Sequence, residues 1–571
     1  MIQAAFFVLA LSVSLNAQQP AASPADDAQV GTISGTVVTE SGQPLIGAVI
    51  SVRAIGPSFI GRTTTSNTDG NFKVAGLDNS IYFVTAYSPA YTSPPLSIDG
   101  QAPTYRVGDT VRLELTRGAV ITGTLTNSSG EPMIGVRVRA VMVRDAAGKP
   151  TKGAVFSFGE RQTDDRGIYR IFGLAPGVYI IQAGGGGLGS GVSVTDMDAP
   201  TYAPSSTRDT ASEIQVRSGE EATVDIRYRA EPGHSISGTV KTQGSGGANI
   251  SLSRVGDGLM PTNGSFQAPG SKGFAIYGLA DGEYEVMAQE AMTTTFTTFP
   301  EMAMSDPLRV TIRGSDVSGL ELVPKPLASI AGKVVMEPSK LQECQNKRQP
   351  LLSETTITLI ANRKDTEFDQ SAFMRSVMGV VLPDKEGAFN LRNIRRGQYA
   401  LTPRFFARYW YLKAISIPPT TPQAKQTASL KDLARSWTTI KAGDRITGLT
   451  ITLAEGAASI RGQVTVDRDK KLETGLSVYL IPSERDKAED PLRYLTQVVA
   501  ADGTFLLTSI PPGHYWVLAQ QPEPDSPTST EKLRLPDALD TRTKIRRAAE
   551  SVKVEVELKP CQNLTDYKIK I

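Results

Sequence analysis

One short phrase recurs five times along the chain, and it constrains the fold more than any other feature of the sequence. Each copy reads Ile, a small or polar residue, Gly, one further residue, and then Val or Leu. The five glycines are Gly35, Gly123, Gly238, Gly332 and Gly462. Because these copies lie about one domain length apart, the repetition predicts tandem copies of a single structural unit.

A second phrase closes each copy. A Gly is followed by an aromatic residue, then by Leu or Ile, and then by a Tyr five residues later; the third copy is one residue shorter. The five tyrosines are Tyr82, Tyr179, Tyr284, Tyr399 and Tyr515. Between the two phrases, short runs such as residues 48–52 and 136–140 alternate apolar and polar side chains. This alternation is typical of strands with one buried face. Short strands separated by Gly-containing turns predict β-sandwiches.

The sequence therefore predicts an all-β chain of five tandem sandwiches, with short helices in the last one around residues 484–495 and 537–552. The expected segments are a signal peptide (1–17), a linker (18–30) and sandwiches at 31–116, 117–230, 231–325, 326–454 and 455–571, the last with a C-terminal tail. Each closing strand runs within a few residues into the next opening phrase. Such short joints predict restricted bending between sandwiches, and hence a rod or an arc.

The paired phrases resemble the carboxypeptidase regulatory-like domain over nearly all of residues 31–559. This resemblance implies prealbumin-like sandwiches, a transthyretin-like fold that is also grouped with carbohydrate-binding-like folds. The last two copies look like exported bacterial repeat proteins. In metallocarboxypeptidases the module accompanies a zinc peptidase domain, which has no counterpart in this sequence. The shared motifs are structural, so the resemblance implies a fold and no activity.

Export is expected from the N-terminus. Residues 4–15 form an apolar run that is too short to span a membrane and fits a secretory signal peptide cleaved after Ala17. No second apolar run of spanning length follows, so no membrane span is expected after signal removal. The expected location is the periplasm, the cell surface or the extracellular space. The two cysteines, Cys344 and Cys561, suggest one disulfide in such a compartment, with two free thiols as the alternative.

The amino-acid composition argues against several kinds of partner and catalytic site. The net charge of +2 gives no electrostatic reason to expect a nucleic-acid partner. Two histidines exclude a multi-histidine zinc centre, and no metal or cofactor is expected. A hydrolase with Asp164 and Asp384 as general acid and base is the least favoured alternative, since a glycosidase needs two carboxylates in one cleft and the motifs place no such pair.

The best binding candidate is the aromatic run at residues 404–411. Exposed aromatic faces stack on sugar rings or pack on a protein partner, and packing between the fourth and fifth sandwiches is the alternative. The candidate ligand-binding residues are Phe405, Tyr409, Trp410 and Tyr411. The sequence thus predicts an exported, non-enzymatic binding or spacer protein. Its possible partners are a carbohydrate or another envelope protein, and carbohydrate binding is the main alternative function.

Overall fold

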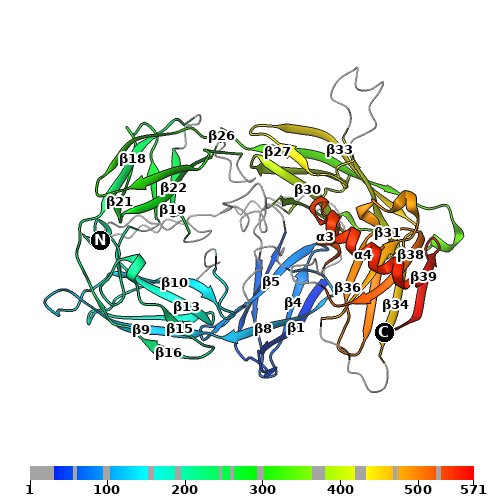
Figure 1. Ribbon diagram of the computed structural model, residues 1–571, viewed down its shortest axis with the longest axis horizontal. Helices are drawn as coiled ribbons and strands as arrows, with labels where there is room; N and C mark the ends of the chain where they lie inside the picture. The colour runs from blue at the N-terminus through cyan, green and yellow to red at the C-terminus, as the bar shows by residue number, and fades with distance from the viewer. Residues whose placement is uncertain are drawn as a thin grey trace, which may run out of the picture.

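The computed structural model describes residues 31–55, 61–93, 103–151, 160–186, 194–242, 247–256, 263–291, 301–362, 380–417, 432–466, 472, 475–522 and 529–571. The expected signal peptide and linker lie outside these residues. In the described part of the chain, ten sheets form five consecutive pairs, which we number sandwich 1 to sandwich 5 (Figure 1). The prediction of tandem β-sandwiches is confirmed. No helix in this part of the chain is long and apolar enough to cross a membrane.

Sandwich 1 pairs the sheet β4-β1-β8-β6 with the sheet β3-β2-β5-β7. Its strands are β1 (Gly31–Thr39), β2 (Val49–Ala54), β3 (Gly61–Thr65), β4 (Asn71–Leu77), β5 (Ile81–Tyr87), β6 (Tyr91–Thr92), β7 (Thr104–Arg106) and β8 (Thr110–Arg117). Sandwich 2 follows after a single residue. Its strands are β9 (Ala119–Thr126), β10 (Arg137–Asp145), β11 (Glu160–Gln162), β12 (Ile168–Leu174), β13 (Gly177–Ala183), β14 (Thr201–Tyr202), β15 (Ile214–Val216), β16 (Glu221–Thr223) and β17 (Ile226–Arg227).

Sandwiches 3 and 4 repeat the plan. The strands of sandwich 3 are β18 (His234–Val240), β19 (Ala248–Arg254), β20 (Asn263–Gln267), β21 (Phe274–Leu279), β22 (Gly282–Ala291), β23 (Met302–Met304), β24 (Leu308–Ile312), β25 (Val317–Leu322) and β26 (Lys325–Pro326). The strands of sandwich 4 are β27 (Ala328–Glu337), β28 (Thr356–Ala361), β29 (Ala388–Ile394), β30 (Gly397–Arg404), β31 (Trp410–Ser416), β32 (Thr438–Ile440) and β33 (Arg445–Glu455).

Sandwich 5 adds the helices. Its strands are β34 (Ala458–Thr465), β35 (Ser477–Pro482), β36 (Leu495–Val498), β37 (Thr504–Ile510), β38 (Gly513–Gln520), β39 (Glu555–Leu558) and β40 (Asn563–Lys570). The helices are α3 (Thr530–Leu533) and α4 (Leu539–Val552), and α4 confirms the expected helix near residues 537–552. Leu533, Ile545 and Ala549 of these helices pack with Tyr479 and Trp516, which come from the sheet beneath them. The helices therefore give this sheet a second buried face.

The opening phrase forms the central strand of one sheet in every sandwich. In sandwich 1, β1 pairs antiparallel with β4, which carries the closing phrase, and parallel with the last strand β8. The central strands β9, β18, β27 and β34 have the same two kinds of neighbour. The two phrases recur together because they are hydrogen-bonded neighbours in the sheet.

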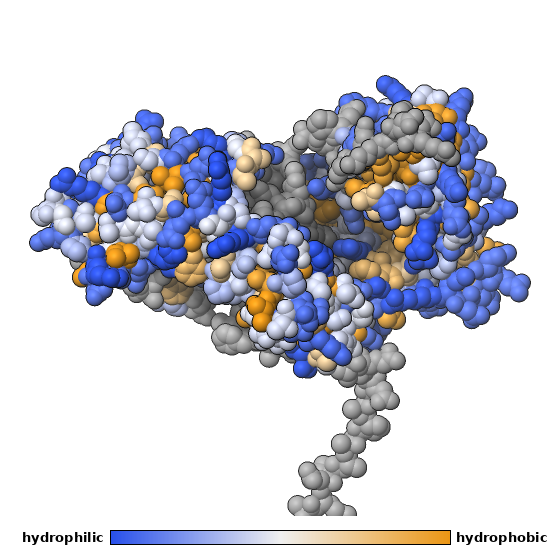
Figure 2. Space-filling view, turned by 90° about the horizontal axis from the view of Figure 1, so that it is seen from below, coloured by the Kyte–Doolittle hydropathy of each residue, from blue (hydrophilic) through white to orange (hydrophobic). Residues whose placement is uncertain are grey.

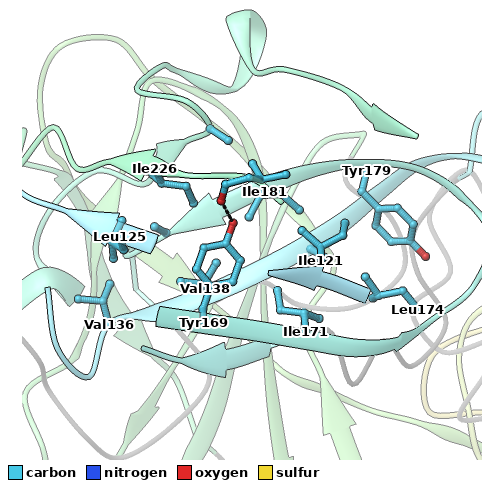
Figure 3. Packing of buried hydrophobic residues seen from close by; sticks show 14 of the residues in the cluster. Ile121, Leu125, Val136, Val138, Tyr169, Ile171, Leu174, Tyr179, Ile181 and Ile226 are labelled. Carbon is cyan, nitrogen blue, oxygen red and sulfur yellow. Dashed lines mark hydrogen bonds between the residues drawn. The ribbon is translucent and has the colours of Figure 1, made fainter. Parts of the chain in front are cut away.

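Close backbone packing explains the Gly of the opening phrase. A Cβ on Gly123 would lie 1.9 Å from the carbonyl oxygen of Val224 in the adjacent segment. The corresponding distances for Gly35, Gly238, Gly332 and Gly462 are 1.9, 2.2, 2.4 and 2.3 Å. Only a residue without a side chain fits at this point of the sheet. Figure 3 shows the core of sandwich 2, in which Tyr169 donates a hydrogen bond to that same Val224 carbonyl oxygen.

The Tyr of the closing phrase has a repeated hydrogen bond. The hydroxyl of Tyr179 donates to the carbonyl oxygen of Ala175, four residues earlier, at 2.7 Å. Tyr82, Tyr284 and Tyr515 make the same bond at 2.8, 2.7 and 2.6 Å. Burial raises the pKa of Tyr515 to about 12, so this hydroxyl stays a donor at neutral pH. The phrase therefore fixes the turn between two strands.

The closing phrase also builds the joints between sandwiches. The residue before its Leu or Ile has a positive φ of 57–73° in sandwiches 2 to 5: Gly173, Gly278, Asn393 and Ser509. In each of these four sandwiches, this residue lies against the sandwich that precedes it in the chain. A Cβ on Gly278 would lie 2.2 Å from the Asp196 carbonyl oxygen. The Oδ1 of Asn393 accepts a hydrogen bond from the Met302 amide at 3.0 Å, and the Ser509 amide donates to the Arg408 carbonyl at 3.2 Å.

Candidate functional site

The aromatic run at residues 404–411 lies where three sandwiches meet. It leaves β30, makes a turn in which the Trp410 amide donates to the Ala407 carbonyl oxygen, and enters β31. On its other side, the Tyr409 carbonyl oxygen accepts hydrogen bonds from the amides of Gly456 and Ala457 at 2.9 Å, at the start of sandwich 5. The run is therefore part of the joint between sandwiches 4 and 5, as the packing alternative predicted.

Trp410 is not available to a ligand. It is 1% exposed and belongs to the core of sandwich 4. The prediction that it offers a stacking face is wrong, because the turn before β31 directs its ring into the core. Phe405 and Tyr409 are half-buried against the same core, and Tyr411 is half-buried on β31. Lys347 covers one face of Tyr409, with its Nζ 4.9 Å from the ring centroid. Ligand binding by these three residues stays a prediction.

We expect Trp410→Ala to destabilise sandwich 4 by about 3–5 kcal/mol, because it leaves a large cavity in a packed core. The Nε1 of Trp410 is buried and has no hydrogen-bond partner among the described residues. Trp410→Phe removes this unpaired donor and keeps an aromatic ring in the core. The loss of stability on Trp410→Phe should therefore be less than half of the loss on Trp410→Ala. Hydrogen exchange of β27 and β33 measures both. Equal exchange in Trp410→Ala and the parent chain would contradict the core assignment.

Phe406 makes the contact that the sequence did not suggest. Its ring lies under the guanidinium of Arg106 from sandwich 1, with 4.4 Å between the Arg106 Cζ and the ring centroid. Arg106 also lies 3.8 Å from Glu354, a carboxylate of sandwich 4 whose side chain is 8% exposed. Arg348 holds the same carboxylate at 2.7 Å. A cation shared between an aromatic face and a buried carboxylate gives a specific contact.

Apolar residues complete this contact. Ile55 and Ile81 of sandwich 1 and Val380 of sandwich 4 form one buried cluster, with exposed fractions of 5%, 0% and 7%. Phe83, Leu382 and Phe406 pack against it. We call the contact made by these six residues together with Arg106 and Glu354 the clasp. Through it, the array bends back until sandwich 1 meets sandwich 4 (Figure 1). The array is therefore curved, and a straight rod is wrong.

The predicted disulfide is present. Cys344 and Cys561 are bonded, and they join a short turn after β27 of sandwich 4 to the segment before β40 of sandwich 5. Both side chains are buried. The amide of Cys561 also donates to the Gly456 carbonyl oxygen at 3.1 Å, next to the joint. The bond therefore reinforces the connection between the last two sandwiches.

The two candidate acids, Asp164 and Asp384, accept hydrogen bonds from backbone amides of the turns that contain them. The Oδ1 of Asp164 accepts hydrogen bonds from the amides of Arg166 and Ile168, and Asp384 caps an equivalent turn. These amide donors and the Arg166 side chain lower the pKa of Asp164. A general acid needs the opposite shift. The two carboxylates lie in different sandwiches, Asp164 in sandwich 2 and Asp384 in sandwich 4.

Figure 2 shows one face of the molecule, coloured by the hydropathy of its residues. Hydrophilic side chains dominate the described part of that face, and apolar ones gather in small groups among them. In the described residues, no group of three or more His, Cys, Asp or Glu side chains is arranged to hold a metal ion.

Comparisons with solved structures find matches of low sequence identity. Among solved structures, the chain is similar to the Bacillus anthracis TIE protein (14% identity, 52% of this chain and 51% of that chain, TM-score 0.13). It is also similar to a streptococcal ancillary pilin, with 13% identity over 52% of this chain and 100% of that chain and a TM-score of 0.16. A third similar structure is BcpA, the major pilin subunit of Bacillus cereus, with 11% identity over 52% of this chain and 99% of that chain and a TM-score of 0.14. The chain thus spans about half the length of the TIE protein. These TM-scores are too low to indicate a shared overall arrangement.

No curated protein matches the chain. The model of the carboxypeptidase regulatory-like domain matches residues 32–115, which are nearly all of sandwich 1. The two phrases lie within these matched residues, and they recur in the other four sandwiches with the same strand pairing. Residues 32–115 are a carboxypeptidase regulatory-like domain.

Proposed function

We propose that this chain is an exported, non-enzymatic scaffold that binds or spaces other molecules at the cell surface, in the periplasm or outside the cell. The observation that carries the proposal is the clasp. Tandem sandwiches joined end to end need no contact between the first and the fourth, so a buried cluster there favours a protein whose overall shape matters. The disulfide supports export, because such bonds persist in oxidising compartments.

The joints support the same proposal. In each of them, a residue of the closing phrase contacts the preceding sandwich through its backbone or a short polar side chain. One ion pair with two hydrogen bonds adds to the last joint, where Arg435 of sandwich 4 donates to both carboxylate oxygens of Asp490 at 3.0 Å. Joints of this kind hold neighbouring sandwiches at set angles. A scaffold of fixed curvature presents its loops to a carbohydrate or an envelope protein in a defined arrangement.

Opening the clasp tests the proposal. We expect Ile81→Asp to separate sandwich 1 from sandwich 4, because closure would bury an unpaired carboxylate. Ile81 packs in the clasp and not in the core of sandwich 1, so the sandwich itself should stay folded. Small-angle scattering should show a larger radius of gyration than in the parent chain. Phe406→Ala should shift it in the same direction.

Val49→Asp is the matched control. Val49 lies on β2 in the same sheet and is 42% exposed, so the same carboxylate there meets water and should leave the radius unchanged. If the Ile81→Asp chain kept the parent radius while sandwich 1 stayed folded, the clasp would not set the shape and the proposal of a fixed curvature would be wrong.

A further inference from the structure

A basic pocket lies at the joint between sandwiches 3 and 4. It has a volume of about 550 Å³ and is an open surface hollow. Its charged lining comes from three separate segments: Lys325 on β26, Arg396 in the turn before β30, and Lys441 after β32. The volume is within the range of small-molecule sites, which run from roughly 300 to 1,000 Å³.

Positive charge exceeds negative charge in this pocket. Asp306 is shared between two of the cations, at 2.9 Å from the Lys325 Nζ and 3.2 Å from the Arg396 Nε. Among the described residues, Lys441 forms no ion pair. The backbone amide of Lys441 donates a hydrogen bond to the Asp444 carboxylate at 2.7 Å. This bond stabilises the turn that carries the Lys441 side chain. A chain with a net charge of only +2 thus gathers three cations at this pocket, beside the carboxylates of Asp306 and Asp444.

The rest of the lining suits a sugar ring. Gly397 and Ala442 leave room beside the cations, and Thr439 offers a hydroxyl that donates and accepts. The guanidinium of Arg396 matches the planar geometry of a carboxylate. We propose that this pocket binds one acidic sugar unit of a glycan, with the carboxylate of the sugar held by Arg396 and Lys441. The open hollow accepts such a unit within a longer polymer.

Calorimetry with trigalacturonate on the purified full chain tests this proposal. We expect saturable binding that weakens with added salt, and no binding of the neutral trisaccharide maltotriose. Arg396→Ala and Lys441→Ala should each weaken binding by about 3- to 10-fold, as expected for partly exposed charge pairs. Asp306→Asn should strengthen it, because this change frees two cations. Lys568→Ala, at an exposed lysine of β40 in sandwich 5, is the matched control and should change nothing.

Three outcomes would overturn the inference. The first is no saturable binding of trigalacturonate, or binding that is equal in the parent chain and both pocket variants. The second is inorganic phosphate binding as tightly as trigalacturonate, which would mean that the pocket responds to charge alone. The third is tighter binding of hexaglutamate, which would assign the pocket to an acidic peptide. None of these depends on the clasp, so the scaffold proposal is tested separately.

Discussion

Gly123→Ala is expected to unfold sandwich 2 or to destabilise it by more than about 4 kcal/mol. The new methyl group would lie 1.9 Å from the carbonyl oxygen of Val224 and 2.6 Å from its carbonyl carbon, which are backbone atoms and not the end of a flexible side chain. It would also come within 3.1 Å of the Tyr169 hydroxyl, which donates to the same carbonyl oxygen. The substitution therefore separates two paired strands and breaks a buried hydrogen bond. Hydrogen exchange should show lost protection in β9 and β12, with β34 of sandwich 5 unchanged.

Gly130→Ala is the matched control for Gly123→Ala. Gly130 lies in a turn of the same sandwich with a φ of +85°, and a Cβ there would meet no atom within 4 Å. It should cost only about 1 kcal/mol, from backbone strain without a clash. If Gly123→Ala lowered the stability of sandwich 2 as little as this control, the segment that contains Val224 would be able to move away from β9. The close approach would then not explain the Gly of the opening phrase.

Removing the disulfide is expected to have the second largest effect. The bond joins residues 217 apart, but sandwich 4 already fixes Cys344. When sandwich 5 alone unfolds, the bond closes a loop of roughly 100 residues, for which the chain-entropy model gives about 4–5 kcal/mol as an upper value. The double variant Cys344→Ala, Cys561→Ala should therefore unfold sandwich 5 at clearly lower urea. Hydrogen exchange of β34 and β38 in a urea series measures the loss.

Each single cysteine variant is the control for the double variant. Either one removes the bond, so the two single variants and the double variant should lose similar stability in sandwich 5. Protection in sandwich 2 should not change in any of them. A double variant with the parent urea midpoint would mean that the Arg435–Asp490 pair and the joint hydrogen bonds alone hold sandwich 5 in place.

Much of the fold could be predicted because its determinants are local or repeated. The spacing of the two phrases predicted the strands, since Gly123 and Tyr179 serve contacts that recur in other sandwiches. The apolar stripe of α4 predicted a helix over the last sheet. The cysteine pair predicted the disulfide from number and compartment alone.

The aromatic site could not be predicted in the same way. Alternation along a strand assigns faces only while the strand continues, and the run at 404–411 contains a turn between β30 and β31. That turn resets the alternation, so nothing in the sequence showed that Trp410 enters the core. Phe406, one residue after a named candidate, instead meets Arg106 of sandwich 1.

The sequence by itself determined the repeated unit: where its short strands lie, and where the Gly and the Tyr of the two phrases recur. These depend on contacts within one sandwich that are repeated in the other copies. The disulfide could be suggested as well, because a chain with only two cysteines has a single possible bridge. Only the tertiary structure decided the clasp and the basic pocket. Ile81 and Val380 meet because the angles of three successive joints add up, and Lys325 and Lys441 come together because two sandwiches are held side by side. Such contacts join residues far apart in the chain, so no local pattern encodes them.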